Sequence, residues 1–128
     1  MTYDPRWAAS ASLRRYFITG VNLNSATTDV GTFSVLPAKY RVTRLTGYDA
    51  STNLTLATLD LRTATAGAGT AIVAAYALTG LSAASKFIDA TLAVTADYQT
   101  AASLILRNVT PQGGAATASF CLEILELT

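Results

Sequence analysis

The chain has 128 residues, of which 51% are hydrophobic and 13% are charged, with a net charge of +1 and no histidine. This length predicts one domain with its own core, and the near-neutral charge gives no electrostatic case for binding nucleic acid or acidic lipid. The absence of histidine excludes Ser-His-Asp and Cys-His catalysis and the usual zinc sites, and no apolar run approaches the ~20 residues that cross a membrane.

The sparse charge has two interpretations. The chain is either a β-protein with a neutral polar surface, or a subunit whose flanks are buried against copies of itself. We favour the second, because charged residues are depleted at the centres of interfaces. The single cysteine, Cys121, excludes an internal disulfide framework. The first ten residues, MTYDPRWAAS, lack the apolar segment of a signal peptide, which predicts synthesis in the cytoplasm.

Residues 1–12 are predicted to form an N-terminal arm ahead of a single domain over residues 13–128. The arm holds the only tryptophan, Trp7, beside Pro5 and Arg6, together with Tyr3. It is either a frayed terminus or a tail that docks on a neighbour, and in the second case Trp7 is the anchor, because Trp and Arg are frequent in interface hot spots.

The next part of the chain predicts three strands. Residues 13–23 form the first, which begins with Arg14 and Arg15 and gains β propensity from the aromatic and branched residues that follow. Residues 24–31 are polar and turn-like. Residues 32–36 form a short second strand that ends at Pro37, and residues 40–46 form a third. Residues 47–53, GYDASTN, are rich in loop formers and place Tyr48 in a loop.

Residues 57–75, ATLDLRTATAGAGTAIVAA, form a predicted central hairpin. Hydrophobic and polar residues alternate over 57–63, as in a half-buried strand with Asp60 on the polar face. Leu54 and Leu56 are out of phase with this alternation, which predicts a bulge or a strand start near Leu56 or Ala57. Gly67 and Gly69 supply the loop, because glycine adopts backbone angles that other residues avoid.

The remaining segments complete an all-β pattern. Alanine favours helix in residues 71–81, but the branched residues and flanking glycines favour a strand. Residues 88–95 show the clearest alternation, and residues 103–109 and 118–124 follow, with Cys121 on the face opposite Phe120. About eight short strands at even spacing predict an antiparallel β-sandwich that is jelly-roll-like.

No catalytic, cofactor or metal site is predicted. Asp29, Asp49 and Asp97 fall in predicted loops and can converge as a carboxylate pair or a calcium site, but loop acids are normally solvated and no acidic loop is clustered. The pattern around Gly67 and Gly69 lacks the third glycine and the helix of a dinucleotide fingerprint. Cys121 has no imidazole partner and is interpreted as a structural thiol.

The segment ATLDLRTATAGAGTAIVAA, continued by YALTGLSAASKFIDATLAV, resembles small virion proteins of tailed bacteriophages over residues 54–94. The resemblance implies a jelly-roll capsid decoration (cement) protein, or a module associated with a head or tail fibre, and such proteins commonly assemble as trimers. It transfers no functional residues to this chain.

We therefore expect a non-enzymatic homotrimeric subunit, made in the host cytoplasm and located on the capsid exterior, that binds the major capsid protein or other virion proteins and takes no cofactor, nucleic acid or membrane. Its expected shell contacts are Tyr3, Arg6, Trp7, Arg14 and Arg15. The alternative is a fibre- or spike-associated module that binds a receptor or carbohydrate through the loop aromatics Tyr48 and Tyr98, although tyrosines also commonly border strands.

Overall fold

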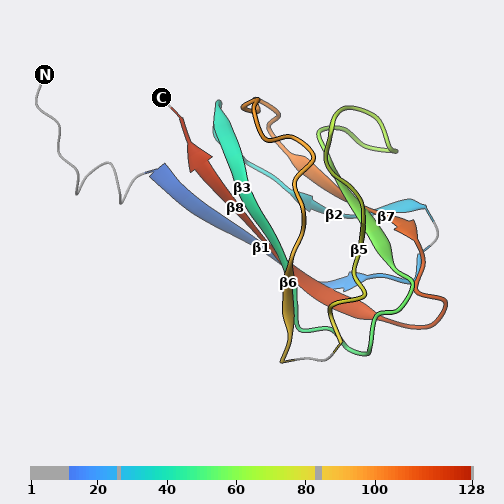
Figure 1. The fold of residues 1–128 in the computed structure, drawn as a ribbon. Coiled ribbons are helices and arrows are strands. Elements are labelled where there is room, and N and C mark those ends of the chain that lie inside the picture. The colour runs from blue at the N-terminus through green and yellow to red at the C-terminus, as the bar shows by residue number, and fades with distance from the viewer. Residues whose placement is uncertain (1–11, 26, 83–84, 128) are drawn as a thin grey trace, which may run out of the picture.

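The computed structural model describes residues 12–25, 27–82 and 85–127, which form two antiparallel four-stranded sheets packed face to face (Figure 1). The strands are β1 (Leu13–Asn22), β2 (Thr28–Phe33), β3 (Tyr40–Tyr48), β4 (Thr58–Arg62), β5 (Ala71–Ala77), β6 (Phe87–Asp89), β7 (Leu104–Thr110) and β8 (Thr117–Glu126). One sheet has the order β1-β8-β3-β6 and the other β2-β7-β4-β5. The predicted all-β antiparallel sandwich is confirmed, whereas the predicted arm lies outside the described residues except for Ser12.

The strand pairs are nested along the chain. β1 pairs with β8, β2 with β7, β3 with β6 and β4 with β5, all antiparallel. Contacts of β8 with β3 and of β7 with β4 then join these four pairs into the two sheets. Most strands that follow one another in the chain therefore lie in opposite sheets, and the core closes between the layers.

The core is formed by the inward side chains of both sheets. In β8, Phe120, Leu122 and Ile124 are buried, whereas Cys121 is only half-buried, so the prediction that Cys121 and Phe120 face opposite ways is confirmed. Tyr40 is fully buried, and its hydroxyl donates a hydrogen bond to the Ala101 carbonyl oxygen at 2.8 Å. A buried tyrosine needs such a partner, because an unpaired hydroxyl would lose its bond to water.

The second strand was predicted too far along the chain. β2 covers Thr28–Phe33 and not residues 32–36, so Asp29 lies in a strand rather than in a loop. The polar start of β2 is stabilised because the carboxylate of Asp29 accepts a hydrogen bond from Arg107 on β7, at 3.0 Å. The strand bends at a bulge between Asp29 and Gly31 and ends with the buried Phe33.

The strand predicted over residues 88–95 is wrong beyond Asp89. β6 covers only Phe87–Asp89, and the alternating residues after it have no partner strand. The Ala90 amide still bonds to the Leu45 oxygen of β3 at 2.8 Å, but the Ala93 amide bonds to the Ile72 oxygen of β5, in the other sheet, at 2.7 Å. The chain thus crosses from one sheet to the other, and its hydrophobic residues cover an open side of the sandwich.

The central hairpin is confirmed, with one correction. β4 begins at Thr58, as the change of phase near Ala57 predicted, and the loop after it uses positive φ angles of 79° at Gly67 and 72° at Gly69. Residues 71–77 form the predicted strand β5. The half-buried pattern is wrong at Asp60, which is 6% exposed.

Asp60 is buried because it stabilises an irregularity of the neighbouring strand. The β4–β5 register shifts between Leu59 and Leu61, where β5 has an extra residue and Ala75 takes a φ of 43°. The Asp60 carboxylate accepts the amide proton of Ala75 at 2.5 Å and pairs with the Arg62 guanidinium at 2.7 Å. A bulge leaves a backbone group unpaired, and here a carboxylate supplies the missing acceptor.

Candidate interaction face

The outer face of the β1-β8-β3-β6 sheet is the part of the molecule best suited to contact a partner. Cross-strand register places its side chains in rows: Leu13 with Leu125 and Arg41, Arg15 with Glu123 and Arg44, Phe17 with Cys121 and Thr46, and Tyr48 with Ser119 and Phe87. Because side chains alternate across a strand, these residues point away from the core, and all of them except the buried Ser119 are at least partly exposed. We call this set, with Asp89, the outer face.

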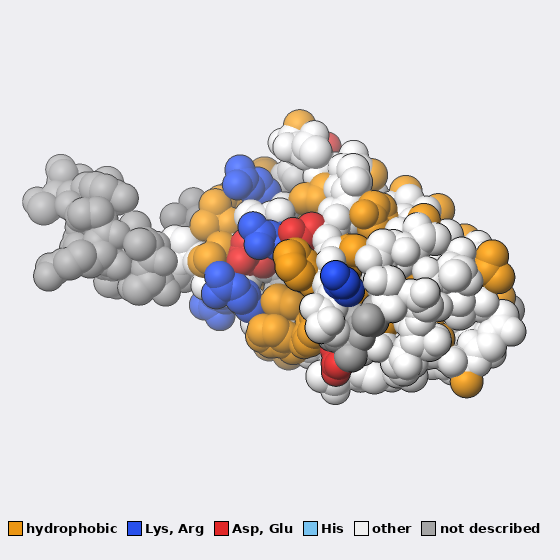
Figure 2. All heavy atoms as spheres, turned by 60° about the horizontal axis from the view of Figure 1, so that its bottom comes forward, with side chains coloured by type: hydrophobic (Ala, Val, Ile, Leu, Met, Phe, Trp, Pro, Cys, Tyr) orange, Lys and Arg blue, Asp and Glu red, His pale blue; other side chains and the backbone are white. Residues whose placement is uncertain are grey.

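The outer face exposes hydrophobic side chains at both of its edges. Phe17 on β1 is 61% exposed and Phe87 on β6 is 67% exposed, and Leu13 is also exposed. The described residues include three further exposed large hydrophobic side chains, Val35, Leu56 and Tyr98, which lie outside these strands. In Figure 2, charged side chains gather with hydrophobic ones toward one end of the visible surface, and the rest is mostly uncharged polar groups and backbone.

The charges of the outer face centre on one glutamate. Arg15 Nε lies 3.1 Å from Glu123 Oε2, and the Thr43 hydroxyl donates to Glu123 Oε1 at 3.0 Å. Arg44 is opposite Glu123 on the other flanking strand. With Arg41 and Asp89, the face holds three arginines against two carboxylates, so it carries a small excess of positive charge.

The two arginines predicted as joint shell contacts point to opposite faces. Arg15 lies on the outer face, whereas Arg14, its neighbour in the same strand, points the other way and pairs with Glu126 of β8 at 2.9 Å. Strand alternation requires this separation. The other predicted shell contacts, Tyr3, Arg6 and Trp7, lie outside the described residues.

Cys121 lies on the outer face between Phe17 and Thr46. Burial raises the pKa of the Cys121 thiol, so the thiol is held in its protonated form at neutral pH. The protonated thiol is a poor nucleophile, which agrees with its interpretation as a structural residue.

The opposite outer face, on the β2-β7-β4-β5 sheet, is partly covered by the loop between β4 and β5. The Ala66 amide in this loop donates to the Asp29 carboxylate at 2.9 Å. The Arg107 guanidinium donates to the same carboxylate and to the Thr27 carbonyl oxygen, both at 3.0 Å. The Ala66 bond, opposed in part by burial and supported by Arg107, lowers the pKa of Asp29. Sequence alternation gave no signal of this network.

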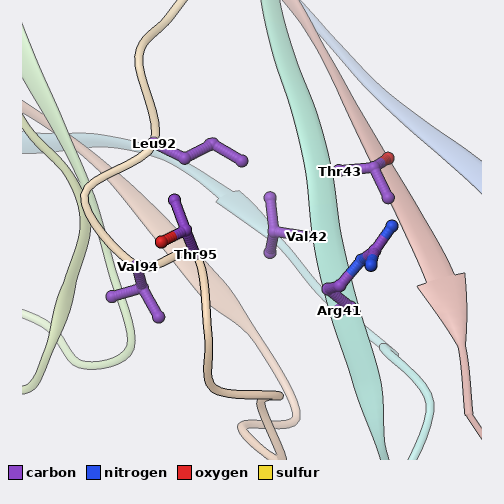
Figure 3. Close-up of a pocket in the computed structure, with 6 residues that line it drawn as sticks. All are labelled: Arg41, Val42, Thr43, Leu92, Val94 and Thr95. Atoms are coloured by element: carbon purple, nitrogen blue, oxygen red, sulfur yellow. The ribbon is translucent and has the colours of Figure 1, made fainter.

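A shallow hollow of about 220 Å³ opens beside β3 (Figure 3). Arg41, Val42 and Thr43 of β3 form one wall, and Leu92, Val94 and Thr95 of the segment after β6 form the other. Only Arg41 among these residues is ionisable, so the hollow offers apolar contact and one positive charge, and no acid–base pair.

The two tyrosines of the carbohydrate alternative are far apart. Tyr48, predicted in a loop, is the last residue of β3, whereas Tyr98 lies beside Gln99, which bonds to Tyr40 at the first residue of β3. A nine-residue strand separates its ends by roughly 26 Å at about 3.3 Å per residue. The ammonium group of Lys39 lies 5.2 Å from the centre of the exposed Tyr98 ring. The structure therefore does not bring Tyr48 and Tyr98 together as one platform.

The predicted loop acids do not form a group. Asp29 of β2 pairs with Arg107 of β7 at 3.0 Å. Within residues 12–25, 27–82 and 85–127, no group of three His, Cys, Asp or Glu side chains could hold a metal ion, so Asp29, Asp49 and Asp97 do not form a calcium site together. The same residues contain no helix long and apolar enough to span a membrane. Comparison of the chain with protein-family models, curated proteins and solved structures found no match.

Proposed function

We propose that this protein is a non-enzymatic structural subunit of a tailed-phage particle, a decoration or cement protein that binds the exterior of the head shell and stabilises it. The observation that carries the proposal is the outer face, where the exposed Leu13, Phe17 and Phe87 share one surface with three arginines in a chain with few charges. Burying such a face against a partner releases apolar surface from water and needs no bond chemistry.

The strand arrangement also supports the proposal. Nested pairing of the first strand with the last and of the fourth with the fifth is what a jelly roll requires, and we propose that the sandwich has this topology. The major capsid protein is the proposed partner, and the proposed assembly is a homotrimer. Many identical contacts on a symmetric shell would reinforce one another, so each one can be weak.

Binding to heads of the encoding phage, measured by co-sedimentation, tests the proposal. Phe87→Lys should reduce head binding at least about tenfold, because it puts a solvated charge into the apolar contact. Val35→Lys is the matched control, since Val35 is 87% exposed and lies outside the face. Equal binding of the two variants would remove the outer face from the proposal, and failure of the wild-type chain to bind heads would reject the function.

A second experiment separates the outer face from the N-terminal segment. Deleting residues 1–11 should abolish head binding while the thermal unfolding transition of the domain is retained. Unchanged binding would show that residues 1–11 contribute nothing to the shell contact. The solution mass, from size exclusion with light scattering, tests the trimer: three copies of the 13.3 kDa chain give about 40 kDa.

A further inference from the structure

The edge of β1 is the longest open sheet edge in the described part of the chain. β1 has ten residues and pairs there only with β8, so the backbone groups along its other side lack a strand partner. The other edge strands are shorter: β5 has seven residues, β2 six and β6 three. An open edge is a template for a further strand, and proteins usually protect it by bulges, prolines or charges.

The charges of β1 give weak protection. Arg14 is paired with Glu126 and Arg15 with Glu123, both glutamates being on the inner neighbour β8. The guanidinium groups are therefore directed toward β8 and their charge is balanced. An incoming strand would not have to desolvate an isolated charge at this edge.

The regular part of the edge is six residues long. Leu13–Ile18 follows β8 in continuous register, from Leu13 opposite Leu125 to Ile18 opposite Phe120. The register then shifts before Val21, where Gly20 has a φ of 63°. A pairing strand can therefore use residues 13–18, and the irregularity near Gly20 ends the pairing.

We propose that β1 pairs antiparallel with β1 of a second copy across a twofold axis, with Tyr16 on the axis and Arg15 opposite Phe17 of the second copy. Residues directly opposite in an antiparallel pair share a face, so only registers that join outer-face residues to outer-face residues make one continuous sheet. The register centred on Arg15 brings two arginines together. The register centred on Tyr16 instead places each arginine beside an exposed aromatic ring, which is attractive.

This proposal deepens the proposed self-assembly and rests on it. A twofold contact joins two copies, or two trimers on a shell, and leaves the threefold contact to another surface. The joined sheet would carry both outer faces on the same side, so the hydrophobic contact surface offered to the shell would double without any new side chain.

Disulfide trapping tests the register. In a Cys121→Ser background, Arg15→Cys and Phe17→Cys are prepared singly and mixed, oxidised, and analysed on non-reducing gels. The mixture should give at least about fivefold more disulfide-linked dimer than either variant alone, because only residues 15 and 17 are then opposite within bridging distance. Dimer from Arg15→Cys alone would overturn this register, and no enrichment in the mixture would overturn the pairing.

Sedimentation velocity over a concentration series tests the edge itself. Phe17→Lys should weaken self-association at least about tenfold, because the new ammonium group faces Arg15 of the second copy. Phe87→Lys is the matched control: the same residue type with similar exposure, on the same face but at the opposite edge. Equal effects of the two variants would overturn the β1 contact. Since neither measurement uses phage heads, the result is independent of whether the chain binds a shell.

Discussion

Replacing Gln112 with alanine should destabilise the sandwich, because this side chain joins the loop between β7 and β8 to the segment that leads into β4. Its Oε1 atom accepts the amide protons of Thr55, Leu56 and Ala57 at 3.0–3.1 Å. Its Nε2 atom donates to the Thr55 hydroxyl at 3.0 Å, and its backbone amide bonds to the Leu23 oxygen at 2.9 Å. Three successive amides that converge on one oxygen form a small nest that favours an acceptor.

The expected loss of stability in Gln112→Ala depends on which of the lost hydrogen bonds water can replace. Thr55 and Leu56 are exposed, so water takes over their amide bonds at little cost, whereas Ala57 is fully buried. Leaving one buried donor unsatisfied costs ~1–3 kcal/mol, and the lost exposed bonds add about 0.5 kcal/mol each at most. We therefore expect Gln112→Ala to lower the free energy of unfolding by about 2–3 kcal/mol, or the melting temperature by roughly 6–12 °C.

Urea denaturation followed by circular dichroism measures this change. Gln112→Glu should lose less than the alanine variant, because a carboxylate still accepts from the three amides. Gln99→Ala is the matched control: Gln99 pairs with Tyr40 through backbone atoms, which the substitution keeps, so the expected change is within about 0.5 kcal/mol. If Gln112→Ala behaves like Gln99→Ala, the hydrogen bonds to the nest do not stabilise the fold.

Three further predictions concern ionisable groups. Burial raises the pKa of Tyr40 to about 12 from its ordinary 10.0. Wild-type stability should therefore fall between pH 10 and 12, because Tyr40 ionises first in the unfolded chain. Urea titrations should show that Tyr40→Phe loses about 1 kcal/mol at pH 7 and has a smaller alkaline loss than the wild type. The pKa of Asp29 is lowered from 3.8, mainly by its bond to the Ala66 amide. The contribution of Asp29 to the free energy of unfolding is therefore present above pH 3.8 and is lost as the pH falls through the lower folded pKa. Asp29→Asn should reduce the loss of stability at acid pH, and an unchanged acid loss would contradict the assignment. Arg41 and Arg44 make none of the ion pairs found in the described residues. The double variant Arg41→Gln and Arg44→Gln should therefore bind heads with a weaker dependence on salt concentration than the wild type. Identical salt dependence of the two proteins would place these arginines outside the contact.

The alternation of hydrophobic and polar residues predicted most of the strands, but it did not predict which segments pair with a neighbouring strand. Residues 118–124 were predicted correctly, because alternating residues of β8 do face the core on one side. Residues 88–95 alternate equally well, yet only the first part pairs, since the chain then crosses to β5. Whether a neighbouring strand is available depends on the whole topology, which a two-residue period does not encode.

The candidate site was predictable only in part. Arg15 could be named from its position at the start of a strand, but Phe17 and Phe87 could not be assigned to a surface, because both lie in strands where an aromatic residue normally packs inward. The burial of Asp60 had no sequence signal either, since it depends on a bulge in β5 at Ala75. These outcomes depend on register, which pairs residues far apart in the sequence.

The two outer faces of the sandwich differ in a way that bears on function. On the β2-β7-β4-β5 sheet, Asp29 binds the loop between β4 and β5 and pairs with Arg107, and Asp60 pairs with Arg62, so charges there satisfy one another within the chain. On the β1-β8-β3-β6 sheet, no loop makes a comparable contact among the described residues, and aromatic side chains stay exposed. In the described part of the chain, the outer face of this sheet carries one ion pair, between Arg15 and Glu123, and exposes Leu13, Phe17 and Phe87, which a partner can bury. This asymmetry, rather than any reactive group, is the structural basis for proposing an assembly role.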